Sequence, residues 1–140
     1  MSEFTSLDRC AAYVAARTAL TAVQRVAEAW PEGLAERARG AAADTMHLTA
    51  DAIAHDHASP GRRRCLRDAL TRAIGVAASV DIARAMGLDG AELEHAQRTA
   101  GRTVALLGMF LHASTSAIPE PQGASRAIVA TRAIRAARAP

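Results

Sequence analysis

Apolar side chains recur at three- and four-residue spacing through most of this chain, which is the pattern of amphipathic α-helices. The clearest case lies between Ser59 and Gly87, where the serine suits an N-cap, Pro60 suits the first helical position and the glycine suits the C-terminal cap. Its apolar stripe comprises Leu66, Ala69, Leu70, Ala73, Ala77, Val80 and Ala83. We therefore expect a helix here that packs against other helices.

The same spacing predicts two helices before this one. The first should begin near Ser6 and stop before Trp30-Pro31, because proline disfavours helical geometry in the residue that precedes it. The second should run from Glu32 to about Ala58. The expected inward-facing residues of the two helices are Leu7, Cys10, Val14, Val23, Val26, Leu34, Ala38, Ala41, Thr45, Leu48, Ala52 and Ile53.

A fourth helix is predicted after Gly87, with Asp89 as its N-cap and its end before Pro119. Its inward stripe comprises Leu93, Ala96, Ala100, Val104, Leu107 and Leu111. The connections are short, about two to four residues, so consecutive helices should be antiparallel. Strand signals are absent, and we expect an all-α, up-down-up-down four-helix bundle over residues 1–118.

Residues 119–140 form an arginine-rich tail that begins with two prolines, and it is expected to be either disordered or a short helix. The chain has 140 residues, which is too few for a second core. Half of its residues are apolar but only 3% are aromatic, so the core must come from close packing of alanine-rich helices. The small segment 40–43 should let a neighbouring helix approach closely.

The two cysteines, Cys10 and Cys65, are far apart in the sequence and form no C-x-x-C pair, which favours a reduced, cytoplasmic protein. No secretory leader is visible, and the longest uncharged run, 103–119, is shorter than the ~20 apolar residues of a membrane span. We expect a soluble protein without membrane association. The net charge is only +3, so the positions of the charges matter more than their sum.

Four arginines crowd the expected start of the third helix: Arg62, Arg63, Arg64 and Arg67. A helix N-terminus is positively polarised, so cations there are unfavourable by about 0.3–1 kcal/mol each. With arginine forks and free helix N–H groups in one place, the sequence predicts a nucleic-acid or anion-binding site. The alternative is a solvated loop in which Asp56 and Asp68 neutralise the cluster.

A second candidate set lies in the tail and comprises Arg126, Arg132, Arg135 and Arg138. If the tail is helical, the last three share a face suited to RNA, DNA or an acidic partner; otherwise they belong to a solvated tail. The tail has no aromatic residue for base stacking, so sequence-specific recognition of single strands is not expected.

Two carboxylate-x-x-histidine pairs, Asp44 with His47 and Glu92 with His95, imitate the ligands of di-metal bundles, and Asp81 could bridge them. The two pairs should differ by roughly 10 Å in depth along the bundle, so one site cannot easily collect both. No nucleophile stands beside a base, and no glycine loop suits a phosphate. We expect no metal, no cofactor and no enzymatic activity.

Three landmarks support a family resemblance: Trp30-Pro31 at the first turn, Ile53-Ala54 late in the second helix, and Met86-Gly87 at the end of the third. In these the chain resembles the bacterial four-helix-bundle proteins encoded in intervening sequences of the large ribosomal RNA gene. That family includes the accessory protein of diversity-generating retroelements. The resemblance covers about 7–114 as an apolar frame, while the family's polar Asn-Ile-Ala-Glu-Gly is replaced at 52–56, as in a divergent member.

The resemblance implies a homo-oligomer, typically a pentamer, without catalytic activity and with affinity for nucleic acid or a reverse transcriptase. Trp30 is then expected at the bundle end or at a subunit seam. We therefore expect a non-enzymatic accessory factor that binds nucleic acid or a protein. The alternatives are a metal-binding bundle and a structural adaptor whose tail docks on a protein partner.

Overall fold

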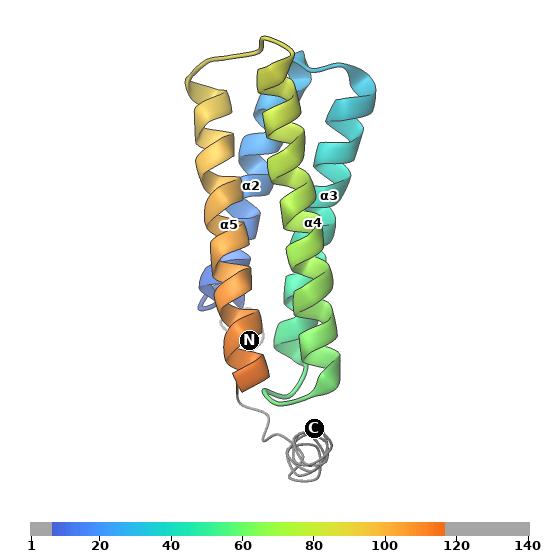
Figure 1. Cartoon of the computed structure of the whole chain (residues 1–140), viewed down its shortest axis with the longest axis vertical. Helices are drawn as coiled ribbons and strands as arrows, with labels where there is room; N and C mark the ends of the chain where they lie inside the picture. Colours follow the sequence, from blue (N-terminus) through green and yellow to red (C-terminus); the bar gives the residue numbers. More distant parts are fainter. Residues whose placement is uncertain (1–6, 117–140) are drawn as a thin grey trace, which may run out of the picture.

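The computed structural model describes residues 7–116 and contains four long α-helices within them. The helices are α2 (Ala11–Val26), α3 (Glu32–Ala54), α4 (Pro60–Ala85) and α5 (Ala91–Ser116), with a 3-10 turn, η1 (Ala27–Ala29), after α2. Each helix packs against the next and α5 packs back on α2, which closes a four-membered ring (Figure 1). The predicted all-α, up-down-up-down four-helix bundle is confirmed.

Three helix boundaries differ from the prediction. The first helix begins at Ala11 because Cys10 has extended backbone, and the second ends at Ala54 because His55 is extended. The last helix begins at Ala91, directly after Gly90, whose φ of +118° suits glycine, so Asp89 is not its N-cap. In each case one residue leaves helical geometry and ends the run, although the apolar spacing continues past it.

The end of α4 follows the prediction. Gly87 has a φ of +89°, and its N–H donates to the Arg84 carbonyl at 2.9 Å. The Leu88 N–H donates to the Ala83 carbonyl at 3.1 Å, which completes a Schellman motif. Glycine avoids the steric cost of this left-handed position, so the chain can turn sharply from α4 toward α5.

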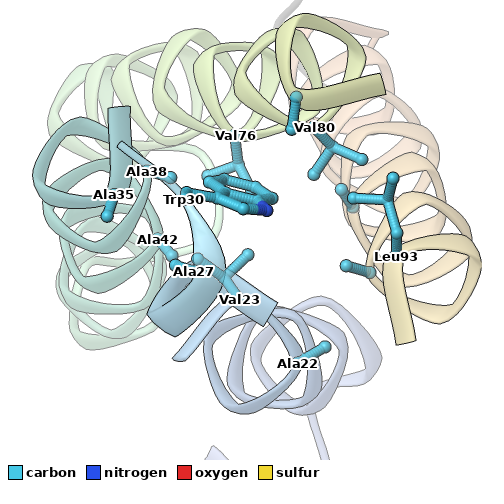
Figure 2. Close-up of a cluster of buried hydrophobic side chains, with 13 residues drawn as sticks. Ala22, Val23, Ala27, Trp30, Ala35, Ala38, Ala42, Val76, Val80 and Leu93 are labelled. Atoms are coloured by element: carbon cyan, nitrogen blue, oxygen red, sulfur yellow. The ribbon is translucent and has the colours of Figure 1, made fainter. Parts of the chain in front are cut away.

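Trp30 fills the centre of the bundle at the end where α2 turns into α3. Its indole lies inside the ring of helices, near Val76 and Val80 of α4 and Leu93 of α5 (Figure 2). Only 7% of the residue is exposed. The expectation of a bundle-end position is met, and within this single chain the tryptophan belongs to the bundle core.

Small polar residues share the core with alanine, valine and leucine. Thr49 and Thr103 are almost fully buried, and each hydroxyl donates to the carbonyl four residues earlier, at 2.6 and 2.8 Å. These bonds satisfy the hydroxyls within their own helices. The bundle therefore buries threonine without any hydrogen bond between helices at these two positions.

Different loops and helix ends lie at the two ends of the bundle. One end has Trp30 and the α4–α5 loop, and the other has the α3–α4 loop, the start of α2 and the end of α5 (Figure 1). Within the described range, no helix is both long enough and apolar enough to cross a membrane. The start of α4 and the point where α5 ends thus lie at the same end.

Candidate nucleic-acid interface

The start of α4 is built as the sequence predicts. Ser59 has extended backbone and its Oγ accepts a hydrogen bond from the Arg62 N–H at 3.1 Å, while Pro60 occupies the first turn. The Ser59 carbonyl accepts the Arg63 N–H at 3.4 Å. The expectation of free N–H groups at this end is therefore corrected for these two residues, and exposed arginine side chains are left as donors for an anion.

One close approach joins the two sides of the loop before α4. A Cβ placed on Gly61 would lie 2.7 Å from Cε1 of His55, so no larger residue fits without moving the imidazole. His55 is the first residue after α3, and Gly61 lies in the first turn of α4. The imidazole that follows α3 therefore lies beside the first turn of α4.

The four arginines in the first turns of α4, at 62, 63, 64 and 67, divide into two kinds. Arg62 is half-buried, and its Nη1 donates to the Ala52 carbonyl in the last turn of α3 at 3.5 Å. A cation is favourable at that negatively polarised helix end, so Arg62 has a structural role. Arg63 is half-buried as well, whereas Arg64 and Arg67 are exposed.

Carboxylates do not neutralise this cluster by direct contact. Among residues 7–116, none lies within 4.0 Å of the four guanidinium groups, so the alternative that relied on Asp56 and Asp68 is not realised as ion pairs. The buried Nε atoms of Arg62 and Arg63 also lack a hydrogen-bond partner there. The start of α4 thus concentrates positive charge where the helix end is itself positive.

The second predicted set, Arg126, Arg132, Arg135 and Arg138, lies outside the described residues. The chain reaches it from Ser116, at the bundle end where α4 begins (Figure 1).

Cys65 lies one turn into α4, half-buried beside this cluster. Burial raises the pKa of its thiol, Asp51 and Asp68 raise it further, and Arg64 opposes them. A raised pKa keeps the thiol protonated at neutral pH, and a protonated thiol is a poor nucleophile and a poor metal ligand. The arginine cluster therefore does not activate the neighbouring cysteine.

The candidate metal ligands are separated by the fold. Asp44 contacts Arg72 at 3.8 Å and His47 contacts Asp51 at 3.8 Å, all on the outer surfaces of α3 and α4. Glu92 and His95 line a different surface, between α2 and α5. Across residues 7–116, no three His, Cys, Asp or Glu side chains gather closely enough to hold a metal ion.

The surface between α2 and α5 has a feature that the sequence did not reveal. Two hollows of about 470 Å³ each lie along this seam, and Thr18 lines both of them. The hollows arise where α2 meets α5, helices about 80 residues apart in the chain, so helical periodicity within either one could not find them. Arginines from both helices surround the hollows.

Comparisons with family models, curated proteins and solved structures find no match for this chain.

Proposed function

We propose that this chain is a non-enzymatic, homo-oligomeric four-helix-bundle accessory protein that binds nucleic acid through the arginines at the start of α4. One observation carries the proposal: this positively polarised helix end bears four arginines that have no carboxylate within 4.0 Å in the described range. Each cation there costs stability, and bound phosphate would remove that cost. The family resemblance supports the same assignment.

Arg64 and Arg67 are the residues best placed to contact phosphate. Both are exposed, and their guanidinium groups present paired N–H donors that suit phosphate oxygens. Arg62 is engaged with the end of α3 and contributes mainly its charge. The tail arginines, which follow Ser116 in the sequence, would add further contacts.

Self-association is supported by the outer surface of α4. Ile74, Ile82 and Met86 are about half exposed, at 52%, 50% and 55%, and the exposed Ala78 lies between the two isoleucines. Large apolar residues grouped on one helix surface are typical of protein interfaces. A second copy is the partner that the resemblance implies, with five subunits as the expected assembly.

The proposal includes no catalytic step. Cys65 has a raised pKa, so the thiol nearest the arginines is not activated. On the outer surfaces of α3 and α4, Asp44 is paired with Arg72 and His47 with Asp51. Binding and assembly are thus the activities to test.

Fluorescence anisotropy of labelled RNA and DNA, as single strands and duplexes, tests the binding on the untagged full chain at 50–200 mM salt. The logarithm of affinity should fall linearly with the logarithm of salt concentration. The double variant Arg64→Gln/Arg67→Gln should reduce the slope by about 0.7–0.9 for each phosphate that the protein no longer neutralises.

The matched control is Arg84→Gln/Arg98→Gln, which removes the same charge nearer the other end of the bundle. It should keep the slope of the native chain. Affinity that does not depend on salt, or an equal loss in the control, contradicts the proposed site. Light scattering coupled to size exclusion tests the assembly: a monomer at low and high salt contradicts self-association, whatever the binding result.

A further inference from the structure

We infer that the seam between α2 and α5 is a docking groove for an acidic amphipathic helix of a protein partner. The groove combines two adjoining hollows, each of about 470 Å³. One wall comprises Asp8 and Arg9, just before α2, and α2 residues between Ala11 and Arg25. The α5 residues are Ala91, Glu92, His95, Thr99 and Arg102.

The groove has the length of a short helix. Its α2 wall extends from Ala11 to Arg25, which at ~1.5 Å per residue corresponds to about 21 Å. Thr18 lines both hollows, so they adjoin at this residue. A helix of about four turns would therefore fit along the seam.

The floor of the groove is apolar. Ala11, Val14 and Ala15 line one half, and Ala22 and Ala91 line the other. The threonine hydroxyls are already used, because Thr18 donates to the Val14 carbonyl at 3.0 Å and Thr21 to the Arg17 carbonyl at 3.1 Å. A floor of this kind buries apolar side chains and offers few hydrogen bonds, as grooves that receive amphipathic helices do.

One exposed methionine lies on α5 beyond the last residue that lines the groove. Met109 follows Arg102 by seven residues, or two helical turns, so both lie on the same face of α5. It is 68% exposed, the largest fraction among the exposed large apolar residues of the described range. Methionine adapts its shape to different partners, which suits an anchor at the end of a docking groove.

The rim of the groove is positive. Four arginines line it against two carboxylates, and Asp8 is already bound to Arg17 at 3.0 Å. Arg9, Arg25 and Arg102 have no carboxylate within 4.0 Å in the described range. An occupant with acidic residues beside its apolar face would satisfy them.

The charge of the rim also favours an acidic helix over the chain's own tail and a second copy of the chain. Residues 117–140 contain four arginines and one glutamate, so the chain's own tail has the wrong sign for this rim. Between residues 67 and 84 the exposed side chains of α4 include three arginines and two acids, so a second copy offers no predominantly acidic helix there; they are Arg67, Arg72 and Arg84 with Asp68 and Asp81. No aromatic side chain lines the groove for base stacking.

A designed peptide tests the inference on the full chain. The probe is an 18-residue, fluorescein-labelled helix with leucine and alanine on one face and glutamate on its flanks, and its twin carries lysine in place of glutamate. Anisotropy should show saturable binding of the acidic peptide only. Arg25→Glu/Arg102→Glu should weaken it by about tenfold or more, because the rim then repels the peptide.

Thr18→Trp fills the groove where the hollows join and should abolish binding, while Arg37→Glu/Arg84→Glu, on other surfaces, should weaken it far less. Amide chemical shifts should change along α2 and α5. Absence of saturable binding, equal binding of the lysine twin, or equal effects of the control and groove variants overturns the inference. Displacement by RNA that depends on the same groove residues also overturns it, in favour of a nucleic acid.

This inference is independent of the nucleic-acid site. The groove variants should leave the salt dependence of RNA binding unchanged, and Arg64→Gln/Arg67→Gln should leave peptide binding unchanged. Either proposal can therefore fail while the other stands.

Discussion

Gly75 of α4 lies against Ala41 of α3: a Cβ placed on the glycine would stand 3.9 Å from the Cβ of the alanine. This distance is an ordinary van der Waals contact, so the two helices approach closely without requiring glycine. The sequence predicted a close approach at 40–43, and Ala41 makes it. Gly40, one residue away, is exposed, and its added Cβ would meet nothing within 4 Å.

Gly75→Ala should raise the free energy of unfolding by about 0.5–1 kcal/mol, because alanine loses less backbone entropy in a helix. Gly40→Ala is the matched control and should give a similar gain without any contact between helices. Urea unfolding followed by circular dichroism measures both. A loss of stability in Gly75→Ala beside a gain in Gly40→Ala would mean that the helices are closer than the structure shows.

Trp30→Ala should be the most destabilising single substitution at the loop end of α2. Removing a large buried aromatic side chain costs about 3–5 kcal/mol, a large part of the roughly 5–15 kcal/mol that typically stabilises a domain. Trp30→Phe keeps most of the buried area and should cost clearly less. Thermal unfolding ranks the three proteins, and equal stability of Trp30→Ala and the native chain contradicts the central packing.

Ser59→Ala should cost about 1 kcal/mol, because the Arg62 N–H loses its side-chain acceptor at the start of α4. Ser59→Gly should cost only a few tenths of a kcal/mol. Thr71→Ala, on the exposed side of the same helix, is the control and should stay within about 0.5 kcal/mol of the native chain. Chemical denaturation measures the free energy of unfolding of each variant. If Thr71→Ala loses as much stability as Ser59→Ala, the result argues against a specific N-cap at Ser59.

The raised pKa of Cys65 has a defined effect on stability. Below the thiol's ordinary pKa of about 8.5, Cys65 is protonated in both the folded and the unfolded chain. The contribution of the protonated thiol to the free energy of unfolding is then fully present. Above it the unfolded chain loses the proton first, so stability falls as pH rises toward the folded pKa. Denaturation curves from pH 7 to 10 should show this fall, and Cys65→Ser should show less of it.

Asp51→Asn tests one cause of the raised pKa of Cys65. Removing that charge should lower the pKa of Cys65 and speed its reaction with a thiol reagent at pH 8. Asp44→Asn, on the same helix, is the control. An unchanged rate in Asp51→Asn would remove Asp51 as a cause of the raised pKa.

Local chemistry explains which parts of the fold could be predicted. Ser59, Pro60 and Gly87 act through their own backbone preferences, and the ends of α4 follow from them. His55 carries no such signal, and its extended conformation is accompanied by the packing of its ring on Gly61. Periodicity within α3 cannot report such a contact with α4.

The same distinction applies to the sites. The sequence could locate the arginines of α4, since a local count of charges at a helix start suffices. The sequence could not show that Arg62 donates to the Ala52 carbonyl while Arg64 stays exposed. That contact depends on the end of α3 lying beside the start of α4. The α2–α5 groove could not be predicted from the sequence, because its walls come from opposite ends of the described chain.

Trp30 is the only tryptophan of the chain, and its burial gives the protein a built-in optical probe. Its emission should be blue-shifted in the native state and move to longer wavelength when the bundle opens. Because the indole lies at the end of the bundle away from the start of α4, ligands at the arginines should leave this signal unchanged (Figure 1). Folding can therefore be monitored without a label while binding is measured separately.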